Sequence, residues 1–158
     1  MFAVILFEPE IPSNTGNIIR LCANTGVALH LVRPLGFTLD DKRLRRAGLD
    51  YHEFATLTVH HNWVDCAGTL KERRIFAVST KGLQRYDLND YAEGDAFLFG
   101  PETRGLPAEI LHTFPEERRI RVPMVPGSRS LNLSNTVAVV IYEAWRHVDF
   151  VPPHRLPL

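Results

Sequence analysis

The apolar stretch Phe2-Ala3-Val4-Ile5-Leu6-Phe7 is typical of a strand that is buried on both faces of a sheet. A turn that holds Pro9 and Pro12 follows it. Next comes Asn14-Thr15-Gly16-Asn17, which is expected to cap a helix running to about Thr25. Similar apolar runs alternate with helical patterns along the rest of the chain. This alternation predicts an α/β fold with a mainly parallel sheet and helices on both faces.

Outward from this stretch, the same patterns place the remaining elements. Further strands are expected at residues 28–32, 54–59, 75–79, 96–100 and 120–123. Helices are expected at residues 40–47, 62–70, 106–112 and 134–148. The last helix carries the clearest apolar stripe, and Ser134 or Asn135 is expected to cap it. Residues 1–158 are therefore expected to form a single domain, with an irregular, proline-rich tail at 149–158.

Composition limits the classes of function without selecting one. The formal net charge is zero, so net charge gives no support to nucleic-acid binding. Basic clusters at 42–46, 71–74 and 118–121 could contact a phosphate backbone, but such clusters are more often solvated faces, and charge alone does not favour RNA over that interpretation. The two cysteines and the absence of a long apolar run indicate a cytoplasmic protein with no membrane contact. The apolar start is too short for a signal peptide and lacks a basic lead.

Several common chemical signatures are missing. The first strand is not followed by the G-x-G-x-x-G fingerprint, and the chain has neither a P-loop nor a G-x-S-x-G nucleophile elbow. His60-His61 has no cysteine or carboxylate set at ligand spacing, so we expect no metal and a solvated or loop-facing histidine pair.

Three segments stand out as candidates for chemistry. In the first, Asn14 to Arg20, a strand end and a glycine-bearing turn lead into a helix whose N-terminus could hold a phosphate. Arg20 suits phosphate oxygens, but a capped helix with an exposed arginine explains this segment as well.

The second segment, Leu98 to Pro107, runs from a buried strand into a turn with two glycines and two prolines. Ligands in open α/β sheets bind beyond the carboxyl ends of strands, and Gly100 and Gly105 would allow main chain to approach one closely. A tight turn would also need glycine. The third segment, Val122 to Asn135, is a long loop rich in hydroxyls and amides, of which a helix cap would explain only two residues.

Taken in order, the three segments resemble the three motifs of the TrmH-like branch of the SPOUT methyltransferases. The matches are N-x-G-N-x-x-R from Asn14 to Arg20, F-G-P-E-x-x-G-L from Phe99 to Leu106, and I-x-V-P-M…S-L-N-L-S-N from Ile120 to Asn135. Within that branch, Leu6 to Pro12 and Lys42 to Tyr51 are similar to the small enzymes that methylate the tRNA wobble nucleotide.

The resemblance implies a deep trefoil knot in the C-terminal third and a homodimer with sites near the subunit interface. It implies transfer of a methyl group from S-adenosylmethionine to the ribose 2'-hydroxyl of nucleotide 34 of tRNA, a cytidine or modified uridine. The residues implied to hold the cofactor are Val78, Thr80, Gly100, Glu102, Gly105, Val122, Met124, Ser130 and Leu131.

Catalytic roles are implied for Arg20, Ser130, Asn132 and Tyr142, although a helix tyrosine beside an apolar stripe also fits the core. Because a guanidinium stays protonated in proteins, we expect Arg20 to hold a phosphate and orient the ribose. The residues expected to contact RNA are Asn14, Arg20, Arg43, Lys81 and Arg129. Methylation of ribosomal RNA or of another tRNA position, and a non-catalytic knotted RNA-binding module, remain as alternatives.

Overall fold

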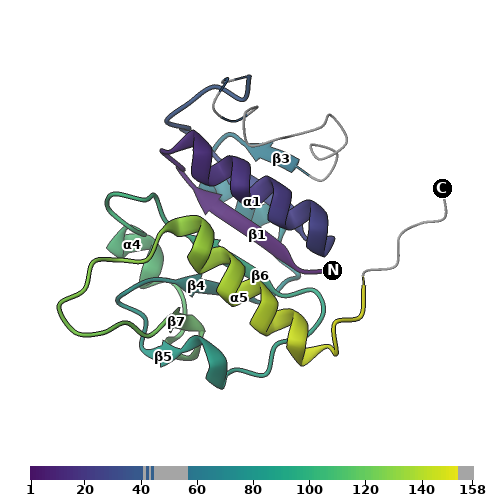
Figure 1. The fold of residues 1–158 in the computed structure, drawn as a ribbon, viewed down its shortest axis with the longest axis vertical. Helices are drawn as coiled ribbons and strands as arrows, with labels where there is room; N and C mark the ends of the chain where they lie inside the picture. The colour runs from purple at the N-terminus through teal and green to yellow at the C-terminus, as the bar shows by residue number, and fades with distance from the viewer. Residues whose placement is uncertain (41, 43, 45–56, 153–158) are drawn as a thin grey trace.

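A computed structural model describes residues 1–40, 42, 44 and 57–152, and in these ranges a parallel sheet forms the centre of the molecule (Figure 1). The sheet has seven strands in the order β3-β2-β1-β6-β4-β7-β5, and neighbouring strands pair in parallel. The strands are β1 (Ala3–Phe7), β2 (Ala28–Val32), β3 (Leu57–His60), β4 (Ile75–Val78), β5 (Gln84–Arg85), β6 (Ala96–Phe99) and β7 (Arg119–Arg121). The predicted α/β class and parallel sheet are confirmed.

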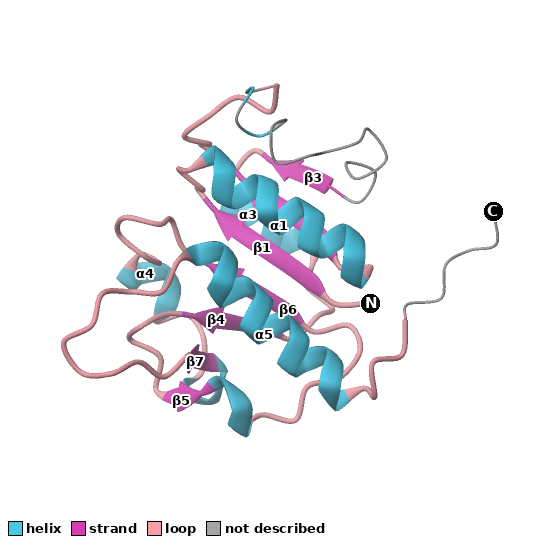
Figure 2. Ribbon diagram, viewed as in Figure 1, coloured by secondary structure: helices cyan, strands magenta, loops and turns pink. Residues whose placement is uncertain are grey.

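Helices cover both faces of the sheet. Helices α1 and α5 lie on the near face in Figure 2, packed against each other, and α3 and α4 cover the far face. The helices are α1 (Pro12–Thr25), α3 (Trp63–Thr69), α4 (Ala108–Leu111) and α5 (Leu133–His147), with short 3-10 turns at Tyr86–Leu88 and Glu116–Arg118.

The first strand shows why the sheet is buried on both sides. Its residues alternate between two apolar clusters: Val4 and Leu6 pack with α1 and α5, whereas Ile5 packs with residues of α3 and α4. Every residue of β1 is buried. A strand of this kind must be apolar at every position, as the opening stretch predicted.

Helix ends differ from the predictions in ways that follow from local chemistry. Helix α1 begins at Pro12 rather than after Asn14, because proline fits the first helical position and lacks the N–H that would be unsatisfied there. It ends at Thr25, and Gly26 caps it with a φ of 68°, which is in the left-handed region. Asn132, and neither Ser134 nor Asn135, caps α5, since its side chain accepts from the backbone N–H groups of both.

Other boundaries shift by one or two residues. Helix α4 starts after Pro107, which is its cap, and the strand β5 was not predicted because two residues carry no periodicity. Most of the predicted helix at 40–47, together with Arg43, lies outside the described residues. At the C-terminus, the Trp145 indole donates to the Val151 carbonyl over 2.9 Å, which ties the described start of the tail to α5. No described helix combines the length and the apolar character needed to cross a membrane.

Candidate functional site

A cavity of about 450 Å³ opens at the carboxyl ends of β4, β6 and β7. Because parallel strands end at the same edge, residues from distant parts of the sequence meet there. All three segments selected by sequence contribute to its wall: Asn14 from the first, Phe99 to Gly105 from the second, and Val122 to Leu133 in part from the third.

Each residue that we expected to hold a cofactor lies on this wall. They are Val78, Thr80, Gly100, Glu102, Gly105, Val122, Met124, Ser130 and Leu131, and Asn132 joins them. Their contact with a cofactor stays a prediction. Eight further residues complete the wall. Phe99, Pro101, Thr103, Arg104 and Leu133 belong to the second and third segments but had no individual role predicted, and Ile11, Ser79 and Thr136 lie outside the three segments. Most of these adjoin selected residues, so proximity in sequence was the available signal.

The Glu102 carboxylate lies at the start of α1, where we had expected a phosphate to bind. It accepts from the backbone N–H groups of Glu10 at 2.8 Å and Ile11 at 3.1 Å. It also accepts from the Asn14 side-chain nitrogen at 3.3 Å. These donors are therefore engaged by the protein's own carboxylate, and an external phosphate does not need to be invoked to satisfy them.

Asn14 is a bridge between the second and third segments rather than an exposed RNA contact. Its side chain is buried, with 5% of the residue exposed. Its nitrogen donates to Glu102, and its oxygen accepts from the Asn132 amide at 2.9 Å. Asn132 in turn caps α5. Because the amide of Asn14 is used at both ends, this position favours a positioning role over the direct RNA contact that we expected.

At the edge of the cavity, the wall residues Thr103 and Arg104 contact Glu10 and Glu8, and we call these four residues the lip of the cavity. The Glu10 carboxylate accepts from the Thr103 hydroxyl at 2.7 Å and from its backbone N–H at 3.0 Å. These bonds, with a smaller contribution from Arg104, hold the pKa of Glu10 below its usual value. Arg104 also donates to Glu8 at 2.7 Å. The lip thus joins the loop after β1 to the loop after β6.

The two glycines of the second segment have different reasons to be glycine. A Cβ on Gly100 would lie 2.2 Å from the Leu106 nitrogen, so the close approach there is between two stretches of this chain. We had expected the approach to be toward a ligand. Gly105 has a φ of 67° and open space beside it, so backbone conformation accounts for this glycine.

Four expected site residues lie outside the cavity lining that the described residues form. Arg20, Lys81, Arg129 and Tyr142 are all exposed. Tyr142 is 47% exposed and meets Trp145 edge to face, so it is not the core residue that its helical position also allowed. Each of the four is placed where it can meet a partner in solution, and their roles remain predictions.

His60 departs from the solvated or loop-facing pair predicted for it. It ends β3, is 7% exposed and lies against His30 of β2, while His61 is exposed. Burial lowers the pKa of His60, and it lowers that of His30 to about 4. The prediction failed because His30 is a neighbour through strand pairing and lies 30 positions away in sequence.

Comparison with known proteins connects this cavity to a family. Residues 1–142 match the SpoU rRNA Methylase family. The chain belongs to that family. A member from Methylovorus glucosotrophus (strain SIP3-4), named tRNA (cytidine(34)-2'-O)-methyltransferase, is 62% identical over 95% of this chain and 97% of its own.

Solved structures agree with this membership. A protein whose structure addresses 2-OH methylation of C/U34 on tRNA is 43% identical, covers 94% of this chain and 97% of its own, and superposes with a TM-score of 0.88. An AdoMet-bound rRNA methyltransferase from Sinorhizobium meliloti is 24% identical and has a TM-score of 0.81. It covers 93% of this chain and 56% of its own, and this likeness concerns the fold alone. The SpoU family membership thus agrees with the resemblance drawn from the three segments.

Proposed function

We propose that this SpoU family member transfers a methyl group from S-adenosylmethionine to the ribose 2'-hydroxyl of the tRNA wobble nucleotide, cytidine 34 or modified uridine 34. One observation carries the proposal: the three motif segments converge on one cavity at the carboxyl ends of parallel strands. The relative from Methylovorus glucosotrophus, with its tRNA (cytidine(34)-2'-O)-methyltransferase name, supports the choice of substrate.

The cavity suits a cofactor of the size and polarity of S-adenosylmethionine. Its volume of about 450 Å³ lies within the usual range for small-molecule sites. Main chain at Val78, Gly100 and Val122 would bind the adenine edge, with Thr80, Met124, Ser130 and Leu131 around it. Glu102 and Gly105 would hold the loop that faces it. When bound, the cofactor supplies an electrophilic methyl group on a positively charged sulfur.

Arg20 would position the nucleotide for reaction. Arg20 is an exposed residue of α1, and its guanidinium would hold the phosphate beside the target ribose. A phosphate oxygen or water then takes the proton of the hydroxyl, because the guanidinium cannot. Replacing Arg20 with Lys keeps the charge and removes the planar fork. We expect this variant to lose most methyl transfer while its affinity for the cofactor stays near normal.

Residues on the third segment and its flanks would complete the substrate side. Ser130 and Asn132 lie on the cavity wall, and Tyr142 is exposed on α5. Lys81 and Arg129 are exposed and cationic, which fits contacts with RNA phosphates. Removing either charge should reduce the salt dependence of tRNA binding, and the binding should weaken as ionic strength rises.

A homodimer would bring these residues together across two subunits. Support comes from exposed apolar side chains on and beside α5, namely Leu131 at 44%, Val139 at 39% and Tyr142 at 47%. Such side chains commonly mark protein interfaces. We expect light scattering to give the mass of a dimer and Val139→Glu to shift the protein toward monomer.

The C-terminal trefoil knot is also part of the proposal. Support comes from the tight crossing between the loop after β4 and β7, where a Cβ on Gly82 would lie 2.3 Å from the Ile120 carbonyl oxygen. Arg121 donates to the carbonyls of Gly82 and Leu83 at 2.8 and 2.9 Å, which holds the crossing closed.

The two free cysteines fit a reducing cytoplasm, which we infer as the location.

The decisive experiment is incubation with labelled S-adenosylmethionine and tRNA that lacks ribose methylation, followed by nuclease digestion and mass spectrometry. A 2'-O-methyl group at nucleotide 34 is the expected product. Label elsewhere on tRNA, or on ribosomal RNA alone, would keep the reaction and overturn the substrate. Cofactor binding without transfer to either RNA would favour a non-catalytic module.

A further inference from the structure

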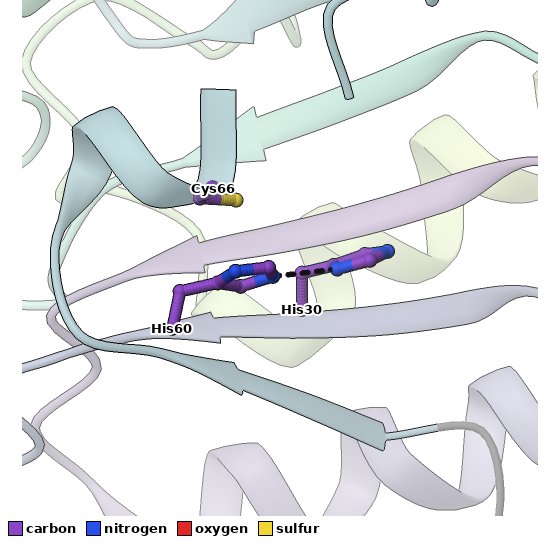
Figure 3. Close-up of side chains that lie close together, drawn as sticks. All are labelled: His30, His60 and Cys66. Carbon is purple, nitrogen blue, oxygen red and sulfur yellow. Dashed lines mark hydrogen bonds between the residues drawn. The ribbon is translucent and has the colours of Figure 1, made fainter. Parts of the chain in front are cut away.

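Three side chains with metal-binding atoms meet on the face of the sheet that α3 covers, apart from the cavity described above. His30 projects from the middle of β2, His60 from the end of β3 and Cys66 from α3 (Figure 3). One ligand atom from each lies within 4.8 Å of the others. No other such group of three is found among the described residues. All three are buried, at 8%, 7% and 0% exposure.

The arrangement of the two imidazoles is close to that of a pair of metal ligands. Nδ1 of His30 lies 2.9 Å from Nε2 of His60, and the rings stack at 24° with centroids 5.1 Å apart. Two imidazole nitrogens that share a tetrahedral ion at about 2.0–2.1 Å would be roughly 3.3–3.4 Å apart. If the two nitrogens moved apart by a few tenths of an ångström, an ion could therefore bind between them. Cys66 lies above the pair (Figure 3).

We propose that His30, His60 and Cys66 bind one thiophilic transition-metal ion of the zinc type. The donor set of one sulfur and two nitrogens selects such ions over the oxygen-seeking Mg²⁺ and Ca²⁺. Water or a neighbouring group would complete a four-coordinate site. The three ligands come from β2, β3 and α3, so the ion would join the edge strand of the sheet to its neighbour and to the helix above.

Proton balance is simple. In the metal-free pair, one imidazole donates its N–H to the other. On binding, that proton moves to the outer nitrogen of the same ring, so both inner nitrogens present lone pairs to the ion. The Cys66 S–H bond breaks, its proton leaves to solvent, and the thiolate binds the metal. One proton is released per ion, and no oxidation or reduction takes place.

The alternative is a metal-free, hydrogen-bonded histidine pair that is part of the core. To decide, the protein is dialysed against a chelator and titrated with Co²⁺ and then with Zn²⁺. Under the proposal, one equivalent of Co²⁺ produces thiolate-to-cobalt charge-transfer absorption, and Zn²⁺ displaces it. Elemental analysis after gel filtration then finds one Zn per chain. Absence of the band together with substoichiometric Zn would overturn the site.

Matched variants locate the ion. Cys66→Ala and His60→Gln should weaken Zn²⁺ binding by more than about 10–100-fold, the loss typical of removing even an outer partner of a ligand. Cys22→Ala removes the other buried cysteine and His61→Gln removes the exposed neighbouring histidine, and both should bind Zn²⁺ as the parent does. Unchanged binding in Cys66→Ala and His60→Gln would place the metal elsewhere.

If the ligand variants fail to fold, the parent protein still decides the question. Zn²⁺ should slow alkylation of Cys66 at least about tenfold, as followed by peptide mass spectrometry, because thiolate bound to the ion is withheld from the reagent. Alkylation of Cys22, which lies in the opposite apolar cluster, should not change. Equal effects of Zn²⁺ on both cysteines, or none on either, would contradict the proposal.

Discussion

Asn132 donates its side-chain amide to the side-chain oxygen of Asn14 over 2.9 Å, across 118 positions of sequence. The side-chain nitrogen of Asn14 in turn donates a hydrogen bond to the Glu102 carboxylate. One short chain of hydrogen bonds therefore links the three segments that form the cavity. Since each member depends on the next for its orientation, the network can be tested one residue at a time.

We expect Asn14→Asp to destabilise the fold by about 1–3 kcal/mol. The new carboxylate keeps the acceptor for Asn132, but it loses the donor to Glu102 and places a second negative charge beside it. Asn17→Asp, at an exposed position of the same helix, should change stability by less than about 0.5 kcal/mol. Denaturant unfolding measures both, and equal losses would mean that the effect arises from the helix and not from the network.

Glu102→Gln tests the centre of the same network. A glutamine turns an N–H donor toward groups that now donate to the carboxylate, among them the backbone N–H of Glu10. We expect a loss of about 1.5–3 kcal/mol, the usual contribution of hydrogen bonds to a charged group. Glu109→Gln makes the same exchange at an exposed position of α4 outside this network, so it is the control for replacing a glutamate with a glutamine. Chemical denaturation at neutral pH compares them, and a stable Glu102→Gln would argue against the role given to the carboxylate.

Gly100→Ala should be among the most damaging single-methyl changes in the chain. Its Cβ would lie 2.2 Å from the Leu106 nitrogen and 2.4 Å from the Gly105 carbonyl carbon, and backbone at both points cannot move aside cheaply. We expect at least about 3 kcal/mol of lost stability, or failure to fold. Gly68→Ala, inside α3 with nothing within 4 Å of the new methyl, should instead gain about 0.5–1 kcal/mol. Thermal melts of the two variants should thus move in opposite directions.

The contribution of Glu10, at the lip of the cavity, to the free energy of unfolding should decrease at acid pH. The folded pKa of Glu10 lies below the ordinary value of 4.5, so its contribution to stability is complete above that pH. This contribution is lost as the pH falls through the folded value, where Glu10 becomes protonated. The difference in unfolding free energy between the parent and Glu10→Gln should therefore shrink as the pH is lowered below 4.5. A difference that is constant over this range would show that the bonds from Thr103 do not depend on the charge.

Periodicity along the chain was enough to predict the sheet and its principal helices. Each of the six predicted strands overlaps a strand of the structure, and the stripe on α5 packs into the core as expected. Helix starts were less predictable because several polar residues in a row can each act as a cap. Asn132 caps α5 since its oxygen reaches two backbone donors, and no feature of the sequence ranks it above Ser134.

Pairings between distant residues were beyond sequence reasoning. The motifs indicated Glu102 and Asn14 separately, but their mutual bond follows only from the order of strands in the sheet. The same holds for His30 and His60, which become neighbours because β2 pairs with β3. A spacing rule for metal ligands examines nearby positions in the chain, so it could not find this pair.

The bond between Asn14 and Asn132 also has a consequence for synthesis on the ribosome. The N-terminal segment leaves the exit tunnel early, whereas its partner emerges only when most of the chain has been translated. A nascent polypeptide therefore cannot complete the cavity wall until α5 has emerged and docked on α1. The complete wall of the small-molecule cavity is therefore acquired late in translation.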